Sequence, residues 1–428
     1  MKTHPRKRIL FLAHRVPYPP DKGDKIRGYH VLQYLCERYE VHLACLCDDD
    51  KDWAQKDALR QLTPHYYVEK FSATKRQFSP LLALSNDMPI SVAAFYSNKF
   101  RQYLLQLTKK EYYDVIYVFS SNVAFYAKEL NAPLKIVDFC DLDSVKFKEF
   151  ATKRKWPLNK IFEIEYKKLA QYEREIAKHY NYILFVNDRE RELFRYPAAN
   201  GKIRIIGNGV QVHDYQNLLK VYSQQYDGQI PYLVFLGMMS YYPNVEAAFW
   251  FATQVFPRIK VLIPDLEFYI VGKNPPAKIR RLHNPRIGIY VTGYMEKIDL
   301  LLAKAIAFVA PIKTARGVQT KILDAMSHGV PVVTTPDAAR ALSARDGYEL
   351  LVASTEAEFV HAILSILYNL SLRKRIIKGA IDLLKNQFDW TANLSSLSEL
   401  IDTHYHRRVK NGKLSAFSLN ATKAGARS

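Results

Sequence analysis

Residues 311–335 read PIKTARGVQTKILDAMSHGVPVVTT, a stretch in which a strand end, a turn, a helix and a second strand follow one another. Gly317 permits a tight turn in which the backbone comes close to a ligand. The residues after it open a helix, whose N–H groups and dipole favour an anion. Gly329 and Pro331 end that helix and begin the next strand. The stretch therefore predicts a unit that can hold a phosphate group.

Three charged side chains lie in this turn and helix. Lys321, one turn into the helix, adds a positive charge beside a diphosphate, and Arg316 adds another from the turn. Asp324, two turns in, is placed to accept hydrogen bonds from ribose hydroxyls. We expect these three residues to be catalytic, and an ordinary structural unit with solvated charges is the alternative. Further contacts to the same ligand are expected from Gly317, Val318, Gln319 and Thr320.

The alternation of strand and helix continues on both sides of this stretch, which predicts an α/β protein with two doubly wound parallel sheets. In the first half, strands are expected at 8–13, 41–46, 115–119, 135–139, 182–186 and 203–206. In the second half, they are expected at 232–236, 266–271, 289–292, 305–310 and 330–334. Ligands of open α/β sheets lie beyond the carboxyl ends of the strands. The residues expected to bind the phosphate-containing ligand there are Gly237, Met238, Gly272, Gly293, Tyr294 and Met295.

The length of 428 residues suits two α/β domains of about 200 residues each. We expect an N-terminal acceptor-side domain at 1–212, a polar linker at 213–230 and a donor domain at 231–388. A helix at 389–406 is expected to pack back towards the N-terminal domain. The small, basic residues 407–428 predict a disordered tail.

The loop after the first strand reads HRVPYPPDKGDKIR, residues 14–27. His14 and Arg15 lie at the strand end, where they can meet an acceptor or a leaving phosphate, although a structural loop histidine is the alternative for His14. Lys25 and Arg27 lie on the first turn of the next helix and are expected on the acceptor side. Gly23 is expected to border the donor, because this loop would face the second domain.

Several of these stretches resemble GT-B glycosyltransferases, in particular the large retaining family 4. Residues 323–326, LDAM, match the family's Leu-Glu-Ala-Met element, and residues 329–333 match its closing Gly-x-Pro-Val-Val. The narrower resemblance is to sugar transferases associated with bacterial exopolysaccharide and PEP-CTERM loci. It rests on residues 14–27, on Asp138, Asp141, Asp143 and Ser144 as a D-x-x-D-x-D-S element, on IGNGV at 206–210 and on FLGMMSYYPNVEAAFWF at 235–251.

The resemblance implies GT-B architecture, with two Rossmann-like domains facing each other across a cleft. It implies transfer of a sugar from a nucleotide-sugar donor with retention of anomeric configuration, to a lipid-linked or polysaccharide precursor. Neither a cofactor nor a metal is expected, so Asp141 and Asp143 are read as acceptor ligands rather than metal ligands, with capping of the next helix as the alternative. Two departures concern the donor site: Arg316 replaces an acidic residue, and Asp324 replaces the usual glutamate.

The formal net charge of +20 favours an anionic partner without choosing among nucleic acid, acidic lipid and phosphorylated substrate. Between 146 and 180, lysines alternate with aromatic residues, which suits an anionic membrane surface, with a solvated helix face as the alternative. In the same region Glu165 and Glu173 match a family pattern or face solvent. We expect no nucleic acid partner. The remaining alternatives are a nucleotide-sugar epimerase and a non-catalytic protein that binds nucleic acid or an anionic surface.

No apolar stretch reaches the roughly 18 to 20 residues that span a bilayer, and the apolar run 9–13 is too short for a secretory signal. All four cysteines lie in the first third, without zinc-ligand spacing. The sequence therefore predicts a cytoplasmic protein, with peripheral attachment to the inner face of the plasma membrane.

Overall fold

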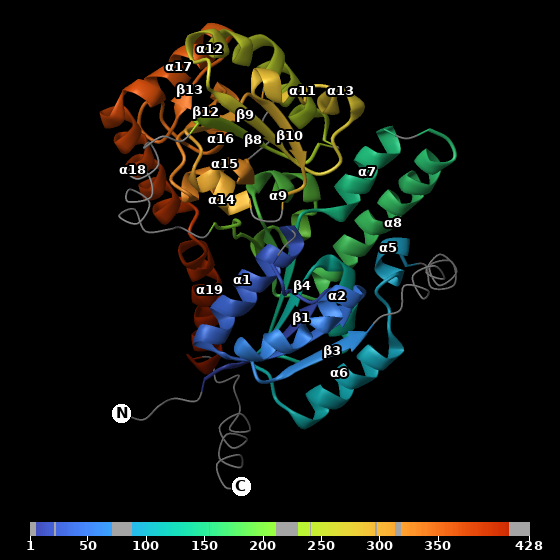
Figure 1. The fold of residues 1–428 in the computed structure, drawn as a ribbon. Helices are drawn as coiled ribbons and strands as arrows, with labels where there is room; N and C mark the ends of the chain where they lie inside the picture. Colours follow the sequence, from blue (N-terminus) through green and yellow to red (C-terminus); the bar gives the residue numbers. More distant parts are fainter. Residues whose placement is uncertain are drawn as a thin grey trace, which may run out of the picture. The chain divides into compact units, whose positions relative to one another are not determined.

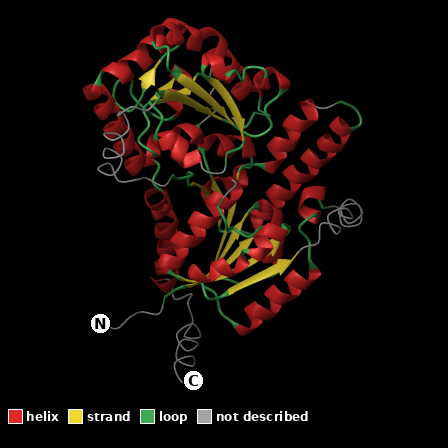
Figure 2. Ribbon diagram, in the orientation of Figure 1, coloured by secondary structure: helices red, strands yellow, loops and turns green. Residues whose placement is uncertain are grey.

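The computed structural model describes residues 6–20, 23–70, 88–153, 155–210, 230–239, 241–295, 298–312 and 318–410. The chain divides into two compact units. Unit 1 comprises Met1–Asn208 and Asn393–Ser428, and unit 2 comprises Gly209–Ala392. In each unit the strands lie between helices (Figures 1 and 2).

Unit 1 holds a seven-stranded parallel sheet in the order β3-β2-β1-β4-β5-β6-β7. The chain builds outward from β1 to β3 and then restarts beside β1 with β4, so the switch point lies between β1 and β4. The strands are β1 (Arg8–Ala13), β2 (Glu40–Cys47), β3 (Tyr66–Lys70), β4 (Val115–Phe119), β5 (Leu134–Cys140), β6 (Tyr182–Phe185) and β7 (Ile203–Ile205).

Unit 2 repeats this plan with six parallel strands in the order β10-β9-β8-β11-β12-β13, so its switch point lies between β8 and β11. The prediction of two doubly wound parallel sheets is confirmed. The strands are β8 (Tyr232–Leu236), β9 (Glu267–Val271), β10 (Ile289–Gly293), β11 (Ala307–Ala310), β12 (Val332–Thr334) and β13 (Leu351–Val352).

Both sheets are buried on two faces, which explains why their central strands are runs of apolar residues rather than alternating patterns. All five residues of β4 and all four of β11 are buried. In unit 1 the rings of Phe11 and Tyr117 stack between neighbouring strands at 5.0 Å between centroids. Each unit has its own hydrophobic core around its sheet.

The helices of unit 1 cover its sheet, and side-chain caps begin several of them. Ser97 accepts a hydrogen bond from the backbone N–H of Phe100, and Asn187 accepts one from Glu190. The α-helices are α1 (Gly23–Arg38), α2 (Asp50–Ala54), α5 (Ile90–Ala93), α6 (Asn98–Lys110), α7 (Asp143–Lys153), α8 (Leu158–Lys178) and α9 (Asp188–Phe194). The 3-10 helices are η1 (Lys56–Gln61), η2 (Ser121–Lys128) and η3 (Pro197–Lys202).

In unit 2 the helix after β8 is interrupted. The first part is followed by a π-helical segment, η4 (Phe251–Val255), because Pro257 lacks an N–H group and opens a new helix there. The helices are α11 (Tyr242–Trp250), α12 (Phe256–Leu262), α13 (Ala277–Arg280), α14 (Ile298–Ala303), α15 (Thr320–Ser327), α16 (Pro336–Ala341), α17 (Glu356–Tyr368) and α18 (Leu370–Gln387), with a 3-10 turn, η5 (Pro285–Ile287).

The last helix, α19 (Trp390–Lys410), runs beyond the predicted end at 406. From Asn393 onward it belongs to unit 1, where Asp402 forms an ion pair with Lys7 and the Ser398 hydroxyl lies 2.9 Å from that of Tyr34. The predicted linker 213–230 falls almost entirely on residues 211–229, outside the described residues, as does the predicted tail from 411 onward.

Candidate functional site

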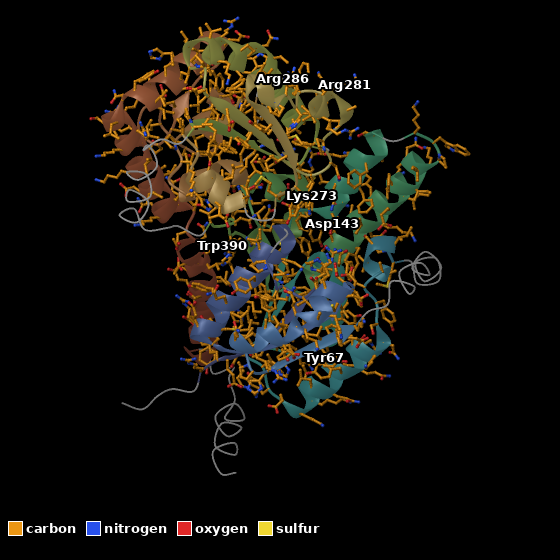
Figure 3. All side chains as sticks on the ribbon, viewed as in Figure 1. Tyr67, Asp143, Lys273, Arg281, Arg286 and Trp390 are labelled. Atoms are coloured by element: carbon orange, nitrogen blue, oxygen red, sulfur yellow. The ribbon has the colours of Figure 1, made fainter. Side chains whose placement is uncertain are left out.

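A cavity of about 510 Å³ opens in unit 1 at the carboxyl ends of four strands. Its walls come from the residues that follow β1, β4, β5 and β6, which places it at the switch point between β1 and β4. Asp143, labelled in Figure 3, lies at this end of the sheet. We call this cavity the unit 1 cavity. The polar residues that line it include His14, Arg15, Arg27, Ser91, Ser120, Asn122, Asp141, Asp143, Lys146 and Asn208.

A buried ion pair forms the floor of the unit 1 cavity. Arg27, from α1, donates from Nε to Asp138 Oδ2 at 2.9 Å, and its Nη1 donates to Asn208 Oδ1 at 3.0 Å. The Tyr117 hydroxyl donates to the same Asp138 oxygen at 2.7 Å. Burial by itself would lower the pKa of Arg27, but Asp138, together with Cys140 and Tyr117, outweighs burial and raises that pKa. The guanidinium therefore stays charged at the base of the cavity.

Two residues on the cavity wall have backbone conformations that are unusual for side-chain-bearing residues. Ser120, after β4, has φ 85° and ψ 135°, and Cys140, at the end of β5, has φ 60°. Hydrogen bonds hold both turns, from Ser120 N to Asp138 O at 2.9 Å and from Val186 N to Cys140 O at 3.1 Å. Strained backbone of this kind collects at ligand sites, where the surrounding structure enforces it.

Asn122 reaches across the cavity wall and leaves one polar atom for a ligand. Its Nδ2 donates to Ser120 Oγ at 3.2 Å and to Asp143 Oδ2 at 3.3 Å. Its Oδ1 is buried and accepts no hydrogen bond within the part of the chain that the structure describes. Because an unsatisfied buried acceptor costs about 1–3 kcal/mol, a donor group from a ligand would be favourable there.

Two carboxylates and a lysine face each other at the cavity mouth. Asp143 also accepts from Ser121 Oγ at 3.2 Å, and Lys146 Nζ lies 4.0 Å from its other oxygen. The pKa of Asp141 is raised by desolvation, which outweighs the nearby Arg27 and is reinforced by Asp143. Asp141 and Asp143 can thus accept hydrogen bonds from hydroxyl groups of a ligand.

Two buried glutamates of α8 accept hydrogen bonds from segments that border the unit 1 cavity. Glu165 accepts from the backbone N–H groups of Ile90 and Ser91, both at 2.8 Å, and so caps α5. Glu173 accepts from Ser144 N at 3.0 Å and from Ser144 Oγ at 2.5 Å, and burial raises its pKa to about 8. Both glutamates are buried, so the alternative that they face solvent is wrong.

Five of the six predicted acceptor residues line this one cavity: His14, Arg15, Arg27, Asp141 and Asp143. Lys25 does not, because it is 2% exposed and its Nζ lies 2.7 Å from Asp52 of α2. Sequence reasoning missed Ser120 and Asn122. Their only signal is that they follow the end of a predicted strand in the order Ser-Ser-Asn.

In unit 2 the predicted donor residues lie at the carboxyl ends of the strands, and two glycines there let the turns approach closely. A Cβ on Gly272 would lie 1.8 Å from the carbonyl oxygen of Gly237. A Cβ on Gly237 would lie 2.8 Å from the side chain of Asn244, whose Nδ2 donates to Met238 O at 3.0 Å. A side chain on Gly272 would displace the Gly237 backbone, and one on Gly237 would displace the Asn244 side chain, so glycine allows both close approaches.

Lys321 lies on the first turn of α15 and reaches back towards β8. Its Nζ donates to Asn244 Oδ1 and lies 5.4 Å from the centre of the Phe235 ring. Burial lowers its pKa to about 8. The lysine thus carries its charge at neutral pH in a partly desolvated position, where that charge acts strongly on an anion.

Asp324 follows one turn later on α15. Burial raises its pKa to about 6, against the nearby His328, which lowers it, while Asp299 raises it further. His328 Nε2 itself lies 3.3 Å from Asp299 Oδ1. No residue within the described ranges donates a hydrogen bond to the Asp324 carboxylate, which leaves its oxygens available to ligand hydroxyls.

The other predicted donor residues are distributed as follows. Met238, Tyr294 and Val318 are exposed by 63%, 61% and 44%, whereas Met295 packs against the core. Lys273, which sequence reasoning missed, follows Gly272 directly, and its Nζ lies 4.2 Å from the Tyr294 ring centre (Figure 3). Gln319 lies at the N-cap position of α15 without a capping hydrogen bond from its side chain, and Thr320 begins the helix. Gly293 ends β10, and Gly23 begins α1 of unit 1. Arg316 and Gly317 lie outside the described residues.

The described residues contain no group of three or more His, Cys, Asp or Glu side chains placed to hold a metal ion. None of their helices combines the length and the hydropathy needed to cross a lipid bilayer.

Residues 230–369 match the family described as Glycosyl transferases group 1. A protein of Klebsiella pneumoniae, described as an uncharacterized 44.6 kDa protein in cps region, is 22% identical over 404 residues, 91% of this chain and 98% of that protein. HepE of Anabaena, solved with UDP-glucose, has a TM-score of 0.56 at 15% identity over 92% of this chain and 99% of its own.

Sucrose-phosphate synthase of Thermosynechococcus elongatus has a TM-score of 0.61 at 13% identity over 94% of this chain and 100% of its own. Both structural likenesses cover nearly the whole length of each partner. The resemblance to GT-B glycosyltransferases is therefore confirmed.

Proposed function

Because residues 230–369 match the group 1 glycosyl transferases, we propose that this chain moves a sugar from a nucleotide-sugar donor to an acceptor hydroxyl. The donor would bind unit 2 and the acceptor would bind the unit 1 cavity. The observation that carries the proposal lies in the first two turns of α15. They bring to the carboxyl end of the sheet the partly buried cation of Lys321 and the carboxylate of Asp324, to which no described residue donates a hydrogen bond.

In the proposed donor site, Lys321 neutralises the diphosphate, and N–H groups at the start of α15 add to it. Arg316 and Gly317, from the preceding turn, complete this cradle as the sequence predicts. Asp324 accepts hydrogen bonds from the ribose. The close turns at Gly237 and Gly272 give the backbone access to the same ligand. HepE, crystallised with UDP-glucose, supports a uridine nucleotide as the first donor to examine.

In the proposed acceptor site, Asp141 and Asp143 accept hydrogen bonds from hydroxyl groups, and Asn122 Oδ1 accepts one more. The acceptor would be a glycan or a polyprenyl-linked sugar of a cell-surface polysaccharide, and the cytoplasm would be the compartment. The Klebsiella relative in the cps region supports the polysaccharide assignment. No covalent nucleophile is proposed: the sugar would be transferred with retention, the leaving diphosphate accepting the acceptor proton while Lys321 stabilises its charge.

UDP binding tests the donor site directly. UDP at 100 times its dissociation constant should stabilise the wild type by roughly 2.7 kcal/mol. Lys321→Ala should weaken UDP at least tenfold, because a hydrogen bond to a charged group contributes about 1.5–3 kcal/mol. Lys385→Ala, an exposed lysine on α18, is the matched control and should bind as the wild type does. Equal UDP affinity in all three proteins would refute the donor site.

Turnover tests the acceptor site. With labelled UDP-glucose and a membrane extract as the source of acceptor, Asp141→Asn and Asp143→Asn should lower transfer while leaving UDP affinity unchanged. The anomeric configuration of the product, read by NMR, tests retention. Transfer that is unaffected by both substitutions would place the acceptor elsewhere.

A further inference from the structure

The helices α7 and α8 of unit 1 form a hairpin that extends beyond the sheet (Figure 1). Three phenylalanine rings hold the two helices together near its far end. The ring centroids of Phe147, Phe150 and Phe162 lie 5.7–5.9 Å apart. The hairpin is thus a packed element with its own small core, and its tip lies at residues 155–158.

The tip and the outer side of α8 expose large apolar side chains. Trp156 is 79% exposed, Leu158 is 47%, Ile161 is 45% and Ile164 is 58%. The last three recur at three-residue spacing, so they share one side of the helix. Large apolar side chains grouped on one exposed side of a helix in this way are typical of an interaction site.

Lysines surround this apolar surface. Lys148, Lys155, Lys160 and Lys167 are all exposed. Glu165 is buried under the hairpin, and Glu163 forms ion pairs with Lys160 and Lys167, each at 3.0 Å. The four exposed lysines outnumber the two partly exposed carboxylates, Glu149 and Glu163, so the surface keeps a net positive charge. A cationic surface with a central tryptophan and aliphatic residues matches an anionic lipid surface, where the indole lies at headgroup level and lysines meet the phosphates.

We propose that the tip of the α7–α8 hairpin docks on an anionic lipid membrane, with Trp156, Leu158, Ile161 and Ile164 entering the headgroup region. Charge complementarity selects this occupant. A second copy of the chain would bring the same lysines against each other, and the net charge of +20 adds to that repulsion.

The α7–α8 hairpin connects the proposed docking surface with the unit 1 cavity. Phe147 belongs to the aromatic cluster of the hairpin and also lines the cavity, as does its neighbour Lys146. A membrane that meets the hairpin tip therefore lies at the end of an element that forms one cavity wall. Resting on the proposed function, this assigns the acceptor to amphiphiles whose sugar projects from an anionic lipid surface.

Vesicle sedimentation tests the role of the exposed apolar side chains in membrane docking. The wild type should bind vesicles of equal parts phosphatidylglycerol and phosphatidylcholine, and bind phosphatidylcholine alone only weakly. Trp156→Ser combined with Ile164→Ser should weaken binding at least tenfold, because both side chains leave water on docking. Val261→Ser with Leu262→Ser is the matched control, since these residues of α12 are 80% and 55% exposed. It should bind as the wild type does.

A second pair of variants tests the charge. Lys155→Ala with Lys160→Ala should weaken binding to the anionic vesicles roughly 25-fold, since each lysine near such a surface contributes about fivefold. Lys374→Ala with Lys378→Ala on α18 is the control, because both lysines are exposed there. Raising the salt concentration should weaken wild-type binding and narrow the difference between wild type and charge variant.

Three results would overturn the proposal: no vesicle binding by the wild type, equal binding by the hairpin variants, or a dimer in sedimentation velocity that Trp156→Ser abolishes. UDP-induced stabilisation should persist in every variant, because none of these residues lies in the proposed donor site. Loss of vesicle binding with UDP binding intact separates membrane docking from the proposed donor function.

Discussion

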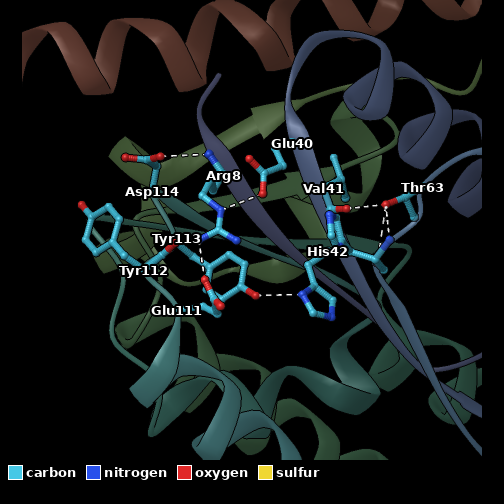
Figure 4. Close-up of polar contacts among 10 residues, drawn as sticks. Arg8, Glu40, Val41, His42, Thr63, Glu111, Tyr112, Tyr113 and Asp114 are labelled. Atoms are coloured by element: carbon cyan, nitrogen blue, oxygen red, sulfur yellow. Dashed lines mark hydrogen bonds and ion pairs between the residues drawn. The ribbon is translucent and has the colours of Figure 1, made fainter. Parts of the chain in front are cut away.

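The two ends of the unit 1 sheet use the same chemistry, an arginine paired with carboxylates, in opposite surroundings. At the amino ends of the strands, Arg8 donates to Glu40 at 2.9 Å and to Glu111 at 2.7 Å (Figure 4). All three side chains are between 32% and 45% exposed. At the carboxyl ends, Arg27 and Asp138 are 3% and 0% exposed.

The two ends differ in how far their charged side chains are exposed to solvent and in whether their polar atoms are already hydrogen-bonded. At the amino ends, neighbouring groups are paired as well: Asp114 accepts from Arg8 N at 2.9 Å, Thr63 donates to Val41 O at 2.6 Å, and the Tyr113 hydroxyl lies 2.9 Å from His42 Nδ1 (Figure 4). At the carboxyl ends the backbone is strained, and Asn122 Oδ1 is buried without a hydrogen-bond partner among the described residues. The carboxyl ends therefore keep a polar atom for the ligand proposed above, whereas the groups named at the amino ends are paired with one another.

The largest expected effect comes from breaking the buried pair. Asp138→Asn should destabilise the chain by about 3–5 kcal/mol, because it leaves the Arg27 guanidinium buried without a counter-charge. Urea unfolding followed by circular dichroism measures this. A loss under 1 kcal/mol would mean that the two ends of the sheet are energetically alike.

The second prediction concerns the effect of pH on UDP binding at the carboxyl ends of the unit 2 strands, and this effect is expected to be smaller. Lys321, with a pKa of about 8, loses most of its charge as the pH rises from 7 to 9, so UDP should bind up to about tenfold more weakly at pH 9 than at pH 7. Lys321→Arg stays charged and should lack this fall.

The sign is opposite for stability without ligand. Between about 8 and the ordinary value of 10.5, the unfolded chain binds the proton that folded Lys321 has released, so stability should rise with pH there. Calorimetric melting of wild type and Lys321→Arg measures it. UDP affinity that is independent of pH would remove Lys321 from the donor site.

A third prediction concerns backbone strain. Ser120→Gly should relieve a φ of 85° that costs about 1–3 kcal/mol, and should lose the two hydrogen bonds that Ser120 Oγ accepts from Asn122 N and Nδ2, of about 1 kcal/mol each. The expected net stabilisation is therefore at most about 1 kcal/mol in urea unfolding. Transfer activity should fall at the same time, because Asn122 loses its support in the cavity wall. A variant that is both less stable and fully active would contradict this.

The smallest effect is expected at the exposed end. Glu111→Gln should cost about 0.2–1 kcal/mol, since Arg8 keeps Glu40 and both groups are accessible to water and salt. Chemical unfolding at low and high salt should reveal a difference that vanishes as salt is added. A cost above 2 kcal/mol would show that this end is as tightly coupled as the cavity floor.

Much of the fold could be predicted from the sequence because the central strands are continuous apolar runs. The predicted strands 8–13, 115–119 and 232–236 agree with β1, β4 and β8 to the residue. The edge strands β3 and β13 were missed, because burial on their outer side is incomplete and the apolar signal is short.

Within the candidate site, positions after strand ends could be predicted, whereas pairings between distant residues could not. Nothing near Lys25 in the sequence indicates that it forms an ion pair with Asp52 of α2. Similarly, Asn244 and Lys321 meet only because α11 and α15 begin beside the same strand ends. The roles assigned to Arg316 and Gly317 stay predictions.

The helix α8 has one more consequence. Its 21 residues form a rod about 30 Å long, with the exposed aliphatic side chains near one end. Along the same helix, Glu165 accepts a hydrogen bond from the first turn of α5, and Glu173 accepts one from the first turn of α7. Both segments border the unit 1 cavity. One helix thus links the proposed docking surface at its tip, through two buried carboxylates, to two segments that line the unit 1 cavity.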